Sequence, residues 1–112
     1  MLIGIMSDSH GQADTVRRAV RLLEREGAEA IIHCGDVGGV EVFCELVGRR
    51  CWFVWGNMDR PDASVRAFLR SAGLPDDPPS PLVLELAGKR IAVCHGHEPC
   101  FRELLEHRGD ID

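Results

Sequence analysis

Hydrophobic positions along the chain alternate between short unbroken apolar runs and longer stretches with helical spacing. The runs 2–6, 30–32 and 51–55 each predict a strand that is buried on both faces, as in a parallel sheet. Between these runs, apolar residues recur every three or four positions over 12–26 and 40–47, which predicts two amphipathic helices. The order strand, helix, strand, helix, strand indicates an α/β fold with a largely parallel sheet and right-handed crossovers.

The second half of the chain follows a different pattern. Asp62 is predicted to cap a short helix, and the proline-rich stretch 74–81 predicts a loop. The runs 82–86 and 90–94 predict two strands of a hairpin, and a last helix follows. We expect His107, on that helix, to face solvent rather than a metal ion. Three apolar side chains of the last helix are predicted to face inward: Phe101, Leu104 and Leu105.

Polar side chains cluster directly after each predicted strand of the sheet and after the hairpin. Because the carboxyl ends of parallel strands meet at one edge of a sheet, we expect these polar segments to lie together. The side chains expected to converge are Asp8, His10, Asp36, Asn57 and His95. Carboxylates, an amide oxygen and imidazoles are donors that suit Mn²⁺, Zn²⁺ or Fe. They are not the cysteine thiolates of a structural zinc site. Each motif alone is typical of an ordinary turn, but the four together, each at a strand end, predict a metal centre.

Composition and charge narrow the classes of protein further. Lys plus Arg is 13 and Asp plus Glu is 18, so the net charge is −5 and the basic footprint of nucleic-acid binders is absent. The apolar runs are too short to span a bilayer, and the first residues lack the pattern of a signal peptide. Five cysteines without motif spacing suit a reducing compartment. We expect a cytoplasmic protein that binds neither membranes nor nucleic acid.

Four ordered motifs resemble those of the calcineurin-like metallophosphoesterase superfamily. They are Asp8-Ser9-His10-Gly11, Gly35-Asp36, Gly56-Asn57-Met58-Asp59 and His95-Gly96-His97. The last two are similar to the small phosphodiesterase branch of that superfamily (YfcE type). The resemblance implies a metallophosphatase-like β-sheet with flanking helices. It also implies a metal-dependent phosphodiesterase or phosphatase that hydrolyses small phosphate esters through a hydroxide activated by two metal ions.

The resemblance implies a role for each matching ligand. Asp8 and His10 would hold one divalent ion, and Asp36 would bridge this ion to a second. Asn57 and His95 would hold the second ion. The two ions are expected to be Mn²⁺, with Zn²⁺, Ni²⁺ or Fe as alternatives.

Three further positions bear on the chemistry. Asn57 is expected to lie near the phosphate as well, and His97 to lie behind the ligands or to face the substrate. Many superfamily members carry a histidine where this chain has Met58, and a thioether cannot donate a proton to the leaving group. A good leaving group or a metal-bound water would make that proton donor unnecessary. His33, at a strand end, is expected to support the site rather than to bind metal.

The superfamily carries one more motif, Gly-His-x-His, which the sequence does not contain. Leu104 begins a Leu-Leu-Glu-x-x-Gly helix exit like the one that leads from the first helix into a strand, so Ile111 is predicted to start another strand. We therefore expect 1–112 to be the N-terminal two-thirds or so of a single phosphoesterase domain that lacks the last strands of its second sheet. The apolar surface left uncovered would favour homo-oligomers. Two rival hypotheses are a fragment that binds metal poorly and a scaffold like the retromer subunit of the same superfamily.

Overall fold

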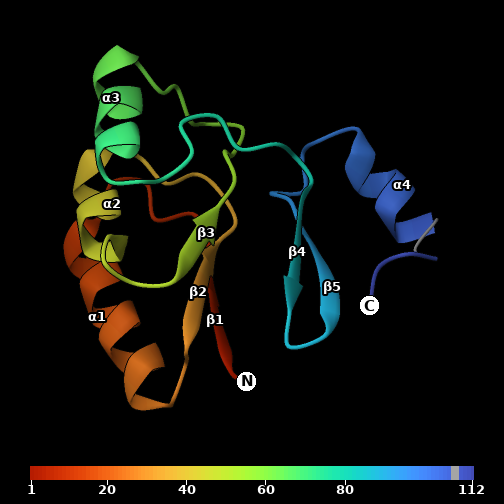
Figure 1. Cartoon of the computed structure of the whole chain (residues 1–112). Helices are drawn as coiled ribbons and strands as arrows, with labels where there is room; N and C mark the ends of the chain where they lie inside the picture. The colour runs from red at the N-terminus through yellow and green to blue at the C-terminus, as the bar shows by residue number, and fades with distance from the viewer. Residues whose placement is uncertain (107–108) are drawn as a thin grey trace.

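A three-stranded parallel sheet lies at the centre of the fold (Figure 1). The structure is a computed structural model that describes residues 1–106 and 109–112. The strands lie in the order β1-β2-β3 and comprise β1 (Ile3–Met6), β2 (Ala30–His33) and β3 (Cys51–Phe53). The predicted parallel sheet is confirmed, although β3 ends two residues earlier than the apolar run predicts. The next residue, Val54, leaves the strand but stays fully buried in the core.

Helices cover one face of this sheet (Figure 1). They are α1 (Ala13–Arg25), α2 (Val40–Leu46) and α3 (Ala63–Ser71). Alternate residues of β2 serve opposite faces, because Ile31 packs with Val16, Val20 and Phe43 under the helices while Ile32 belongs to a second cluster. Asp62 caps α3 as predicted, since its carboxylate accepts the Val65 amide hydrogen at 2.9 Å.

The hairpin forms a second, separate sheet against the other face. Its strands are β4 (Leu82–Leu86) and β5 (Lys89–Val93), which pair antiparallel. Ala87 and Gly88 join them with φ of 51° and 78°, the two positive values that a tight hairpin turn requires. Leu84, Leu86 and Val93 pack on Ile32 and Val54 of the parallel layer. The fold is therefore layered as helices, parallel sheet and hairpin, as Figure 1 shows.

The last helix, α4 (Cys100–Glu106), packs differently from the prediction. Phe101 is 37% exposed and Leu105 is 52% exposed, so the prediction that both face the core is wrong. Their side chains line an open hollow beside β5 together with Ala92 and Ile111, because α4 lies past the hairpin rather than over the parallel sheet. The prediction for His107 falls outside the described residues. Among the described helices, none has the length and hydrophobicity needed to cross a bilayer.

Candidate metal centre

The loops after β1 and β2 run side by side at the carboxyl edge of the parallel sheet. Backbone hydrogen bonds join them, from Asp8 N–H to the Gly35 carbonyl at 2.9 Å and from His10 N–H to the Asp36 carbonyl at 3.0 Å. Asp8, His10 and Asp36 all have positive φ, of 58°, 46° and 56°. Few residues other than glycine adopt this left-handed region, and such strain concentrates at functional sites. These three candidate ligands are therefore held in conformations that the surrounding bonds impose.

Asp8, His10 and Asp36 form the first group of ligand atoms. One donor atom from each lies within 4.8 Å of the others. His10 Nε2 is 3.6 Å from Asp8 Oδ1 and 3.9 Å from Asp36 Oδ2. The Ser7 hydroxyl donates to the Asp8 carboxylate and lowers the pKa of that carboxyl below its usual value. The group thus offers two carboxylates and an imidazole to a single cation.

Asp36, Asn57 and His95 form the second group. His95 Nε2 lies 2.9 Å from Asn57 Oδ1 and 3.3 Å from Asp36 Oδ2. The other ring nitrogen, Nδ1, lies 2.7 Å from the Cys34 carbonyl oxygen, which can only accept, so Nδ1 carries the hydrogen. In the neutral ring Nε2 then presents a lone pair, and it faces two further acceptor oxygens. Three acceptor atoms that converge in this way could hold a cation.

Asp36 belongs to both groups and is almost fully buried, at 4% exposure. Its Oδ2 faces His10 and His95, while its Oδ1 accepts the Met58 amide hydrogen at 2.8 Å. A Cβ at Gly56 would lie 2.2 Å from Asp36 Oδ1, so only glycine admits this approach. The structure therefore brings together all five ligands that the sequence predicts, with Asp36 at their centre.

Asp59 is the last residue of the motif that contains Asn57, and the sequence indicates no role for it. Its carboxylate accepts backbone hydrogens from Val37 at 3.3 Å, Gly38 at 3.2 Å and Gly56 at 2.8 Å. It therefore ties the loop after β2 to the loop after β3. Its position two residues after Asn57 was the only signal in the sequence.

Glu98 was missed entirely, and it organises the loop that carries His95 and His97. His97 stands outside both ligand groups: its ring lies 5.4 Å from the His95 ring, and its Nδ1 is 2.9 Å from Glu98 Oε1. Burial alone would raise the pKa of Glu98, but hydrogen bonds from the Ser80 hydroxyl and from the Gly96 and His95 amides outweigh it and lower the pKa to about 2. Glu98 is therefore an ionised carboxylate throughout the pH range near neutrality.

His33 lies at the end of β2 and is hydrogen-bonded to the two loops that carry the first ligand group, as its predicted supporting role requires. Neither of its ring nitrogens is free to bind a metal ion. The Gly35 amide donates to His33 Nδ1 at 3.1 Å, so Nε2 carries the hydrogen and donates to Ser9 Oγ at 2.9 Å. The Ser9 hydroxyl in turn donates to the Val37 carbonyl at 2.8 Å. Complete burial disfavours the charged ring and lowers the pKa of His33 to about 4.

The depressed pKa of His33 predicts that acid begins to destabilise the protein below about pH 6.5, before most carboxylates titrate. The unfolded chain takes up a proton near pH 6.5, whereas folded His33 resists it until about pH 4. Stability is therefore full above pH 6.5 and falls by about 3 kcal/mol as the pH drops to 4. Urea unfolding in chelator at pH 7 and pH 4.5 measures this loss. His33→Gln, which cannot titrate, is expected to lose about 2 kcal/mol less, and an equal loss in both proteins would contradict the assignment.

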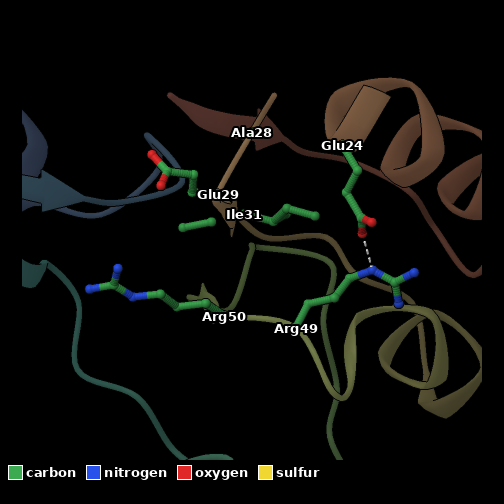
Figure 2. A pocket seen from close by; sticks show the side chains of 7 residues that line it. Glu24, Ala28, Glu29, Ile31, Arg49 and Arg50 are labelled. Carbon is green, nitrogen blue, oxygen red and sulfur yellow. Dashed lines mark hydrogen bonds and ion pairs between the residues drawn. The ribbon is translucent and has the colours of Figure 1, made fainter. Parts of the chain in front are cut away.

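A separate hollow of about 330 Å³ lies at the opposite, amino-terminal edge of the sheet (Figure 2). Glu24 and Arg49 form an ion pair across it, and the Arg50 guanidinium lies 5.4 Å from the centre of the Trp52 ring. Its arginines are thus occupied by partners within the chain. This hollow shares no residue with the two ligand groups, which lie at the carboxyl edge.

Comparison with known proteins places the fold and this edge in a family. Residues 1–110 match the calcineurin-like phosphoesterase superfamily domain, and the chain belongs to that superfamily. It is 26% identical over 114 residues to phosphodiesterase MJ0936 of Methanocaldococcus jannaschii, covering 100% of this chain and 69% of that protein. The predicted family and fold class are both confirmed.

Solved structures agree with this assignment. The structure of an archaeal phosphodiesterase matches with a TM-score of 0.81 at 25% identity, over 100% of this chain and 69% of that one. The phosphoesterase YfcE of E. coli matches with a TM-score of 0.61 at 24% identity, over 88% of this chain and 60% of that one. The chain is thus a member of the phosphoesterase superfamily that spans part of the length of these relatives.

Proposed function

We propose that this chain carries the centre of a metal-dependent phosphodiesterase or phosphatase. The observation that supports it most strongly is Asp36 Oδ2, which faces His10 Nε2 at 3.9 Å on one side and His95 Nε2 at 3.3 Å on the other. A single carboxylate oxygen shared between two ligand groups is an arrangement that suits a pair of cations. Membership of the phosphoesterase superfamily gives the reaction class.

The donor set divides between two divalent cations. Asp8 and His10 would hold the first, Asn57 and His95 would hold the second, and Asp36 would contribute to both. The oxygen and imidazole donors suit Mn²⁺, with Zn²⁺, Ni²⁺ or Fe as alternatives. When bound, such a pair would supply Lewis-acid polarisation of a phosphoryl group and would lower the pKa of the water that replaces the leaving alcohol.

Three side chains around this edge then act on the substrate. Asn57 presents its carboxamide oxygen to His95, which leaves its NH₂ group to donate to a phosphoryl oxygen. His97 has a side chain that is 42% exposed, so it can reach a substrate held at the edge. Met58 is 64% exposed and donates no proton, so the favoured substrates are esters whose leaving group departs as an anion.

The same proposal places the protein in a reducing compartment, the cytoplasm. All five cysteines lie within the described residues and none is in a disulfide.

The substrate that this proposal gives the protein is a small phosphate ester. Phe101 and Leu105, exposed on α4, offer the apolar surface through which copies could associate.

Removing metal is the direct test of this function. Protein treated with a chelator is expected to lose hydrolysis of an activated aryl phosphodiester, and added Mn²⁺ is expected to restore it, because the bound cations would lower the pKa of the attacking water. Release of the chromophoric alcohol measures the rate. Hydrolysis that persists after chelation, with metal content verified, would contradict the proposal.

A further inference from the structure

The carboxylate of Glu98 turns back from the start of α4 toward the loop that carries His95. The His95 amide donates to the Glu98 carboxylate, with its nitrogen 3.1 Å from Oε1 and 3.0 Å from Oε2, and the Gly96 amide donates to Oε1 at 2.8 Å. Gly96 has φ of 117°, in the region that favours glycine, so the chain can fold tightly around the carboxylate. Glu98 therefore closes the turn on which His95 is mounted.

Two further side chains contact the Glu98 carboxylate. The Ser80 hydroxyl donates to Oε2, and His97 Nδ1 lies 2.9 Å from Oε1. The Glu98 side chain is only 9% exposed. Its oxygens are thus committed to donors from the chain and are not available as metal ligands.

His95 is consequently held at two points. Its ring donates through Nδ1 to the Cys34 carbonyl at 2.7 Å, and its backbone is fixed by Glu98. With both ends fixed, Nε2 is aimed at Asn57 Oδ1 and Asp36 Oδ2. Without Glu98, the His95 ring would keep its hydrogen bond to the Cys34 carbonyl. It would lose the backbone position that brings Nε2 together with the two acceptor oxygens.

We propose that Glu98 is a positioning residue that holds the His95 ring in the orientation needed to bind the second metal ion. This inference rests on the proposed function and extends it to a residue outside the motifs. Groups that hold a metal ligand in place typically change metal affinity by about 10- to 100-fold when removed. Because Glu98 touches neither Asp8 nor His10, its removal is expected to weaken the second ion and to leave the first unchanged.

Calorimetric titration of chelator-treated protein with Mn²⁺ tests the inference. Glu98→Ala is expected to weaken the second ion about 30-fold and the first by less than about 2-fold. Glu98→Gln, which keeps one acceptor oxygen and guards against loss of the fold, is expected to fall in between. Glu103→Gln removes the same charge from an exposed position on α4 and is expected to match the wild type.

A second readout needs no metal. In two-dimensional amide spectra of the chelated protein, the His95 and Gly96 resonances are expected to move in Glu98→Gln and to stay in place in Glu103→Gln. Equal weakening of both ions, or two ions bound by Glu98→Ala as tightly as by the wild type, would overturn the positioning role while leaving the proposed function intact. Wild-type protein that binds no ion would overturn both.

Discussion

Asp36→Asn is expected to abolish phosphodiester hydrolysis and to weaken binding of both metal ions. The substitution keeps the side chain's shape, and the amide oxygen can still accept the hydrogen bond from the Met58 amide, whose nitrogen lies 2.8 Å from Asp36 Oδ1. It replaces Oδ2 with an NH₂ group that cannot bind a cation, between His10 Nε2 and His95 Nε2. We expect the rate to fall on the order of 10³-fold, because the loss removes charge from both ligand groups at once.

The measurement pairs the hydrolysis rate with the number of Mn²⁺ ions bound. Asp14→Asn, a substitution of the same kind at an exposed position of α1, is the matched control and is expected to retain wild-type activity. The melting temperature of the chelated protein shows whether the fold survives. A folded Asp36→Asn protein that still binds two ions and hydrolyses the ester at the wild-type rate would show that the centre lies elsewhere.

The arrangement of the candidate ligands followed from the sequence because it depends on topology. Unbroken apolar runs separated by amphipathic helices leave few alternatives to a parallel sheet, and a parallel sheet gathers the residues after its strands at one edge. Asp8, Asp36 and Asn57 were predicted to meet for that reason, although the sequence separates them by tens of positions. Strand order alone brings these residues together, whatever conformation their side chains adopt.

The supporting residues could not be predicted because their roles depend on individual hydrogen bonds. Glu98 and Asp59 are acidic residues in polar loops, and nothing in their neighbours shows which backbone amides they bind. The orientation of α4 was missed for a related reason. Helical spacing identifies the apolar face that Phe101 and Leu105 share, but it does not say what that face packs against.

Gly56→Ala is expected to cost about 3 kcal/mol of stability and to prevent metal binding. An added Cβ would lie 2.2 Å from Asp36 Oδ1 and 2.3 Å from the Asp36 backbone nitrogen, closer than van der Waals contact allows. Backbone cannot move aside as a flexible side chain can, so the loops after β2 and β3 must separate. That separation would also break the hydrogen bond from the Met58 amide to Asp36 Oδ1 at 2.8 Å. Urea unfolding of the chelated protein and Mn²⁺ titration measure the two effects.

Gly4→Ala is the matched contrast for this prediction. Its added Cβ would meet Leu23 Cδ1 at 2.7 Å, which is the end of a flexible side chain rather than backbone. Neither glycine has a φ in the left-handed region, so in both substitutions the difference arises from the space around the added methyl group. We expect Gly4→Ala to cost less, on the order of 1 kcal/mol, and to leave both ions bound, since Gly4 lies in β1 away from the ligand loops. Equal losses of metal affinity in the two variants would mean that the close approach of Gly56 to Asp36 has no particular part in holding the bridging carboxylate.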